Sequence, residues 1–282
     1  MSYNIGLVTI ILIVINVFFT YKGLKYREIF DQYSFEVDYI LLYKDYKRLV
    51  TSGFLHVNWM HLLFNMMSLF VFSESMELFI SAQEYLFIYF VSLIGGNLFS
   101  LYVHRNHGDY TAVGSSGAVS GIIFACIAFQ PGIGVGVFFV PVSVPGWLFG
   151  IFFVLYSVYG IQSKRDNIGH EAHLGGAIIG LIAAIIVHPA AILNNYIVIL
   201  VIIIPGIFFI YLIITRPHLL MIDNRFFKKR GARIINIDHR YNINRANQQE
   251  NINAILEKIH KKGINSLTKK EKDLLDRYSG SN

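Results

Sequence analysis

Long apolar stretches alternate with short polar segments over residues 1–215. An α-helix needs about 20 mostly apolar residues to cross the hydrocarbon core of a membrane. No charged residue occurs before Lys22 or between positions 111 and 163. The pattern predicts an all-α membrane protein, a polytopic helical bundle. By this measure seven stretches predict membrane-spanning helices, at 5–21, 58–77, 83–104, 112–130, 146–162, 171–190 and 195–215.

The polar segments set the expected division of the chain. The last 30 residues predict a helical hairpin, in which Thr268 and Glu271 have the spacing of a capping box. We therefore expect four parts: a six-span core at 1–190, an additional span at 191–215, a polar linker at 216–250 and a small helical hairpin tail at 251–282.

Three further segments have distinct patterns. The first apolar run begins at Ile5 without a basic region or a cleavage site, so we expect a retained first span instead of a signal peptide. Residues 22–57 mix charged and aromatic side chains, which predicts an interfacial and partly amphipathic structure. Three prolines in 131–145 predict a loop, and its apolar residues favour a position along the membrane surface.

Composition supports a membrane protein. Hydrophobic residues make up 54% of the 282 residues and charged residues 15%, with a mean hydropathy of +0.50, which is outside the range of soluble globular domains. Residues 216–282 carry 15 Lys and Arg against 7 Asp and Glu, net +8, so the basic charge belongs to the tail. Such a tail suggests anionic lipid head groups as a partner or simply a solvated domain, and favours both over nucleic acid. Cys126 is the only cysteine, so no intrachain disulfide can form.

Polar side chains recur at the starts of three predicted spans. His61 and Asn65 begin the second span, Ser116 the fourth and His173 the sixth. Because helix direction alternates from span to span, these three starts lie on one side of the membrane. Polar and ionisable groups are costly at that depth, so they are candidate functional residues. Small residues along the fourth and sixth spans would let the helices approach closely enough to bring Ser116 and His173 within about 3 Å.

Three sequence blocks carry a family resemblance. The segment RLVTSGFLHVNWMHLLFN from Arg48 to Asn65, followed by Glu77, is similar to the first signature of the rhomboid intramembrane proteases. GSSG around Ser116 resembles their nucleophile motif, and AHLGGAIIG from Ala172 resembles their histidine-bearing sixth core span. The chain therefore resembles a bacterial-type rhomboid protease with a C-terminal soluble helical extension. The resemblance implies a serine endopeptidase of the membrane that cleaves the transmembrane helices of other proteins.

The resemblance also implies a role for individual residues. Ser116 would be the nucleophile and His173 the general base and acid, while His61, Asn65 and the backbone amide of Ser116 would form the oxyanion hole. No cofactor and no metal is implied, and the partners would be transmembrane substrates and lipids. Three positions depart from the family pattern: Lys47, Ser73 and Ser120, the last where many members have an aromatic residue on the catalytic histidine. Supporting structural roles would fall to Arg48, His56, Glu77, Gly114, Gly117 and Gly176.

Other interpretations remain open. Small residues such as Ser115, Ser116 and Ser120 often only pack helices together. A non-catalytic rhomboid-like binding protein would keep the fold without the activity, and a transporter would more often show an inverted repeat. HEAH at 170–173 resembles a shortened zinc-protease motif, although the true motif spaces its histidines by four residues. We interpret His170 and Glu171 as a pair at a loop end.

The expected location is a cell membrane, and the sequence gives conflicting signals for orientation. Six basic residues lie in 22–57, on the same side as Ser116, and the positive-inside rule would place that side in the cytoplasm. The family resemblance places the catalytic side outside the cytoplasm. We follow the resemblance and expect the active site near the extracytoplasmic side.

Overall fold

The computed structural model describes residues 5–136, 142–163, 168–216 and 220. In the C-terminal region it describes residues 255, 258, 259, 266–268, 271 and 272. The chain divides into two compact units, residues 1–229 and 230–282, and each is described by itself.

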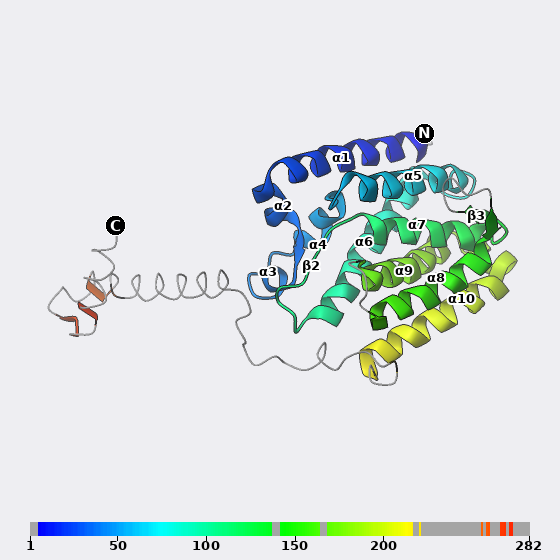
Figure 1. Cartoon of the computed structure of the whole chain (residues 1–282). Helices are drawn as coiled ribbons and strands as arrows, with labels where there is room; N and C mark the ends of the chain where they lie inside the picture. The colour runs from blue at the N-terminus through cyan, green and yellow to red at the C-terminus, as the bar shows by residue number, and fades with distance from the viewer. Residues whose placement is uncertain are drawn as a thin grey trace. The chain divides into compact units, whose positions relative to one another are not determined.

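Each of the seven stretches predicted to span the membrane corresponds to one long helix of the first unit (Figure 1). By length and composition five of these helices could cross a membrane, or six if α5 is joined across a 96° bend to the helical segment Arg48–Phe54. The chain is therefore a multi-pass helical bundle, as predicted. The long helices are α1 (Ile5–Lys25), α5 (Trp59–Met76), α6 (Ala82–His104), α7 (Ser116–Phe129), α8 (Gly146–Ser163), α9 (His170–Val187) and α10 (Ala190–Thr215).

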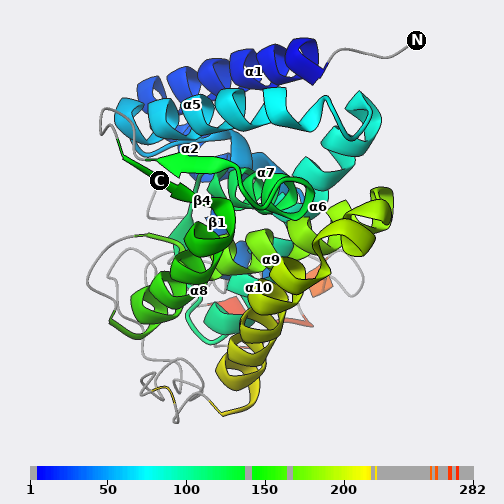
Figure 2. The same ribbon diagram turned by 90° about the vertical axis from the view of Figure 1, so that its right-hand side faces the viewer.

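Helix α7 departs from the predicted stretch 112–130 because it begins only at Ser116 and has 14 residues. The residues Thr111–Ala112 before it form a short strand instead of a helical turn. The helix is also enclosed: every residue from Gly117 to Phe129 is buried. Figure 1 and Figure 2 both show α7 inside the bundle, with α5 on one side and α9 on the other.

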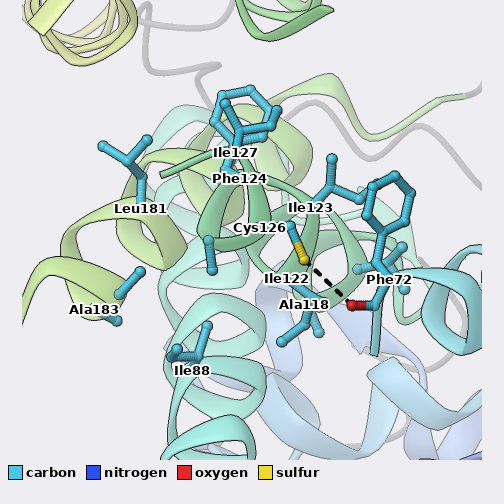
Figure 3. Close-up of a cluster of buried hydrophobic side chains, with 14 of the residues drawn as sticks. Phe72, Ile88, Ala118, Ile122, Ile123, Phe124, Cys126, Ile127, Leu181 and Ala183 are labelled. Carbon is cyan, nitrogen blue, oxygen red and sulfur yellow. Dashed lines mark hydrogen bonds between the residues drawn. The ribbon is translucent and has the colours of Figure 1, made fainter. Parts of the chain in front are cut away.

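The apolar core surrounds α7. A helix that is apolar all round its circumference is stable only when every face is covered, and here α5, α6 and α9 cover it. Figure 3 shows the packing of Ile122, Phe124 and Ile127 within this cluster. The Cys126 thiol donates a hydrogen bond of 3.3 Å to the backbone carbonyl of Phe72 on α5. The enclosed helix carries Ser116 at its first residue, so the core fixes the position of that residue.

The segment between α1 and α5 is compact, as predicted for a structured segment. Buried Arg48 ties it together: its guanidinium donates to the carbonyls of Asp31 (2.8 Å) and Ser34 (2.6 Å) and pairs with Asp45 (3.0 Å). Asn97 on α6 donates to the carbonyl of Leu49 at 2.8 Å. The elements here are α2 (Arg27–Tyr33), β1 (Phe35–Glu36), α3 (Val37–Leu41), α4 (Arg48–Thr51) and the 3₁₀ helix η1 (Ser52–Phe54).

Two short antiparallel strand pairs add to the predicted helices. Strand β1 pairs with β2 (Thr111–Ala112), which joins the segment after α1 to the residues that precede Ser116. Strand β3 (Gly134–Gly136) pairs with β4 (Ser143–Pro145), so the predicted loop 131–145 is partly a hairpin. Sequence analysis missed these strands because two or three residues are too few to show an alternating pattern.

Helix α10 packs along α8 and α9. Asn195 has non-helical backbone angles, and its side chain donates to the carbonyls of Ala128 (2.9 Å) and Phe129 (3.1 Å). These carbonyls belong to the last turn of α7 and have no partner within their own helix. The Asn195 side chain of α10 therefore caps α7 at the end opposite Ser116.

The second unit shows the predicted capping box. Thr268 N–H donates to the Glu271 carboxylate at 2.6 Å, and Glu271 N–H donates to the Thr268 hydroxyl at 3.4 Å. Lys258 forms an ion pair with Glu271 at 2.8 Å, and Ile255 and Leu267 are buried. Most of the predicted linker 216–250 and hairpin 251–282 lies outside the described residues, so the predicted boundaries stay predictions.

Candidate active site

Ser116 is the first residue of α7, and a glycine with a positive φ sets the turn before it. Gly114 has a φ of +132°, a backbone conformation that L side chains rarely adopt. Its N–H donates to the Ser52 carbonyl at 3.0 Å, which anchors the turn to the segment before α5. The Ser116 hydroxyl is left half-buried at the N-terminal end of an otherwise buried helix.

His173 reaches Ser116 from a different helix. The imidazole Nε2 of His173 lies 2.6 Å from the Ser116 Oγ, across 57 residues of sequence. Both side chains are half-buried. This is the distance at which a histidine can accept a proton from a serine hydroxyl.

Close helix contact makes this distance possible. A Cβ on Gly176, one turn after His173, would collide with the carbonyl oxygen of Gly117. Because neither residue has a side chain, the backbones of α7 and α9 meet directly. The predicted approach of the two small-residue helices is confirmed at this contact.

His61 borders the same space. A Cβ on Gly114 would lie 2.8 Å from Cε1 and 3.1 Å from Nε2 of His61, and 3.7 Å from the Ser116 Oγ. The imidazole and the hydroxyl therefore border one point, and glycine at 114 keeps that point open. Asn65 is buried one turn along the same helix, and its amide donates to the His61 carbonyl at 2.9 Å.

An aromatic neighbour of His173 comes from α8. Ser120 has no ring to place beside the imidazole, but the ring of Phe153 lies 6.5 Å from the His173 ring at an interplanar angle of 36°. Phe153 contacts Phe124 and Phe149, at 5.1 and 5.8 Å between ring centroids. Sequence analysis missed Phe153 because α8 has many aromatics and no spacing that singles one out.

The pair His170 and Glu171 is not at a loop end, as the sequence suggested, but in the first turn of α9. Both residues are buried, and the Glu171 carboxylate lies 3.2 Å from Nε2 of His104, the last residue of α6. The His104 ring stacks on Tyr110 with centroids 3.5 Å apart. This contact joins the helix that carries His173 to α6, and only the tertiary fold brings its members together.

The predicted supporting residues lie around the site or at its margins. His56 is fully buried beside Ser115, as described below. Arg48 braces the segment before α5. Glu77 is exposed at the end of α5 farthest from His61, and its carboxylate accepts a hydrogen bond of 2.7 Å from Gly6 N–H on α1. The structure thus brings Ser116, His173, His61 and His56 together and leaves Glu77 apart.

The zinc alternative gains no support from the geometry. Within the described ranges, no three His, Cys, Asp or Glu side chains form a group that could hold a metal ion. His173 instead faces the Ser116 hydroxyl.

Comparison with known proteins gives two family matches. The model of the Rhomboid domain matches residues 43–190, and that of a family of unknown function (DUF6576) matches residues 235–281. The first match contains every residue of the site described above, and the second falls in the C-terminal region.

Several curated proteins are similar to this chain. RHOMBOID-like protein 12, mitochondrial, of Arabidopsis thaliana is 32% identical over 151 residues, which cover 48% of this chain and 44% of the relative. Rhomboid protein 1, mitochondrial, of Saccharomyces cerevisiae is 29% identical over 151 residues, 51% of this chain and 44% of the relative. Rhomboid protease AarA of Providencia stuartii is 31% identical over 166 residues, 50% of this chain and 56% of the relative. The chain spans about half the length of these relatives.

Proposed function

Because this chain belongs to the rhomboid family of intramembrane proteases, we propose that it is a serine endopeptidase that cleaves transmembrane helices with Ser116 and His173. The observation that carries the proposal is the 2.6 Å contact between the Ser116 hydroxyl and Nε2 of His173. A serine hydroxyl is a weak nucleophile until an adjacent base accepts its proton.

The reaction would proceed in two halves. The Ser116 Oγ attacks the carbonyl carbon of the substrate while its proton passes to Nε2 of His173. The tetrahedral intermediate collapses when His173 gives that proton to the leaving amine, and an acyl-enzyme remains on Ser116. Water then attacks the acyl group and gives a proton to His173, and His173 returns that proton to the Ser116 Oγ as the second tetrahedral intermediate collapses and the acid leaves.

The developing oxyanion needs donors on the other side of the carbonyl. We assign this role to the Ser116 backbone N–H, His61 and Asn65. Ser116 is the first residue of α7, so its N–H has no acceptor within the helix, and His61 lies beside Gly114 and the Ser116 Oγ. The support for Asn65 is weaker, because its side-chain amide already donates to the His61 carbonyl. One such donor contributes on the order of 3 kcal/mol to transition-state stabilisation.

Substrates would be membrane proteins whose transmembrane helices unwind locally at the site. In a helix each peptide carbonyl is engaged in a backbone hydrogen bond and is shielded by side chains, so attack requires an extended segment. The half-buried position of Ser116 at a helix end is suited to such a segment. Lipids would be the other partners.

A cleavage assay tests the proposal. The wild-type protein, reconstituted in liposomes with a model transmembrane substrate, should cleave it, and Ser116→Ala and His173→Ala should reduce cleavage to background. Ser120→Ala is the matched control, because it removes a buried hydroxyl one turn along the same helix and leaves the Ser116–His173 contact in place. Cleavage that persists in Ser116→Ala would contradict the proposal. A wild-type protein that binds transmembrane helices without cleaving them would indicate a non-catalytic rhomboid.

We also propose that the protein lies in a cell membrane with Ser116 toward the extracytoplasmic side. The family resemblance supports this orientation, whereas the six basic residues of 22–57 favour the opposite one. A reporter fused after Asn106, in the turn between α6 and β2, reads the orientation directly. A cytoplasmic signal at Asn106 would reverse it.

A further inference from the structure

A chain of buried hydrogen bonds leads from α1 to the residue before Ser116. The Thr20 hydroxyl lies 2.9 Å from Nδ1 of His56 and 3.3 Å from the Phe54 carbonyl. On the other side of the ring, Nε2 of His56 lies 3.3 Å from the Ser115 hydroxyl and 3.5 Å from the Ser115 N–H. Thr20, His56 and Ser115 are all fully buried.

The donors in this chain fix the tautomer of His56. A backbone N–H can only donate, so Nε2 must accept from Ser115 and the ring proton must sit on Nδ1. Nδ1–H then donates to the Thr20 oxygen, and the Thr20 hydroxyl donates onward to the Phe54 carbonyl. Every hydrogen bond therefore runs in one direction, from Ser115 through His56 to Thr20.

His56 also contacts His61, which borders the same space as the Ser116 hydroxyl. Its ring meets the His61 ring edge to face, with centroids 4.9 Å apart and an interplanar angle of 73°. The peptide bond that follows Ser115 carries the Ser116 N–H. His56 thus contacts Ser115, whose peptide bond orients the Ser116 N–H, and His61, whose imidazole is the second assigned oxyanion donor.

We propose that Thr20 and Ser115 are positioning residues for catalysis, which act through His56 on the Ser116 amide and on His61. The inference rests on the proposed function and extends it to α1, which lies outside the residues 43–190 that match the Rhomboid domain. Loss of the Thr20 hydroxyl leaves Nδ1–H without its acceptor. The ring proton can then move to Nε2, where it opposes the Ser115 N–H and turns the peptide that bears the oxyanion donor.

The same helix supplies a matched control. Thr9 is also fully buried on α1, and its hydroxyl donates to the Tyr85 hydroxyl at 3.1 Å. That bond joins α1 to α6 without reaching Ser115 or His61. Thr9→Val therefore removes an equivalent buried hydroxyl from the same helix, with its effect limited to packing and stability.

Fluorophosphonate labelling of the full-length protein in detergent, together with cleavage of a model transmembrane substrate, tests the inference. We expect Thr20→Val to slow labelling and to lower kcat by about five- to tenfold, the effect of losing one buried hydrogen bond, with KM within about twofold of wild type. Thr20→Ser should restore the wild-type rate because it keeps the hydroxyl. Thr9→Val should lower the melting temperature about as much as Thr20→Val and leave kcat unchanged.

A double variant gives a measurement that a change in stability alone would not alter. If the three residues act as one chain, Ser115→Ala should slow labelling by itself but add less than about twofold in the Thr20→Val background, whereas it should keep its full effect in the Thr9→Val background. Labelling of Thr20→Val at the wild-type rate, or equal slowing by Thr9→Val, would overturn the inference and leave the proposed function intact. A wild-type protein that takes no label and cleaves nothing would overturn both.

Discussion

Helices α1 and α10 flank the part of the chain that matches the Rhomboid domain, and they differ in how they contact it. Both are long apolar spans, with only 28% of the α1 window and 22% of the α10 window buried. Helix α1 places the side chains of Thr9, Asn16 and Thr20 inside the bundle, where they form hydrogen bonds. Helix α10 contacts the bundle mainly through isoleucines, with Asn195 as its polar contact to α7.

The two contacts also reach opposite ends of α7. Thr20 connects through His56 to Ser115, directly before the first residue of the helix. Asn195 caps the last turn, which lies about 20 Å away at a rise of 1.5 Å per residue. We therefore expect changes to Thr20 and His56 to alter catalysis and changes to Asn195 to alter stability alone.

The largest effect should come from His56→Phe. Phenylalanine fills the volume but leaves the Ser115 N–H and the Thr20 hydroxyl without the ring nitrogens, so both the Ser116 amide and His61 lose their support. We expect kcat for a transmembrane substrate to fall about a hundredfold or more, the scale of losing an oxyanion donor. The matched control is His188→Phe, because His188 packs against Phe79 and Phe129 at the far end of α7. Equal kcat values for His56→Phe and His188→Phe would contradict the expected difference between the two ends of α7.

Glu171→Gln tests whether a buried contact with α6 also fixes the position of α9, the helix that carries His173. The buried carboxylate pairs with His104, and its loss at the start of α9 removes a charge-assisted contact between α6 and α9. We expect unfolding free energy to fall by about 1–3 kcal/mol and kcat to fall several-fold. Thermal unfolding and cleavage kinetics measure both, with exposed Glu74→Gln as the control. Unchanged stability would show that the pair contributes nothing.

Asn195→Leu should change stability only. The variant leaves two carbonyls of the last turn of α7 without their donor, and we expect a loss of about 1–2 kcal/mol in unfolding free energy with kcat within about twofold of wild type. Asn194→Leu, on the exposed neighbouring residue, controls for the change in polarity. A large fall in kcat for Asn195→Leu would mean that α10 also acts on the site.

The smallest effect should come from the tail. The Lys258 ammonium and the Thr268 N–H and hydroxyl hold the pKa of Glu271 to about 2, below its usual 4.5. A depressed pKa stabilises the folded form above the unfolded pKa, so this contact should persist above about pH 4.5 and weaken as the pH falls toward 2. NMR shifts of Lys258 and Thr268 during an acid titration measure it. Glu271→Gln should abolish that titration and leave cleavage unchanged, whereas reduced cleavage would give the tail a role in activity.

Apolar length predicted the positions of the seven long helices, but only five of them, or six if α5 is joined to the segment before it, are long and apolar enough to cross a membrane. The family blocks pointed to Ser116, His173 and His61, whose catalytic roles stay predictions. The sequence pattern did not predict features that depend on tertiary contacts. The start of α7 depends on Gly114 and on a strand pair between β1 and β2, and strands of two residues leave no periodic signal.

The missed site residues have the same explanation. Phe153, Thr20 and His104 are ordinary residues of apolar helices or helix ends, and only the packing of the helices brings them to His173, His56 and Glu171, respectively. A buried threonine in a span most often bonds within its own helix. The sequence therefore predicts which helices carry the chemistry but not which neighbours position it.

Mass spectrometry of the fluorophosphonate-treated protein shows directly whether Ser116 is the nucleophile and His173 its base. We expect one phosphonyl adduct on the peptide that contains Ser116, absent from Ser116→Ala and at background in His173→Ala, and present at the wild-type level in Ser120→Ala. An adduct on another serine, or labelling of Ser116 at the wild-type rate without the His173 imidazole, would contradict it.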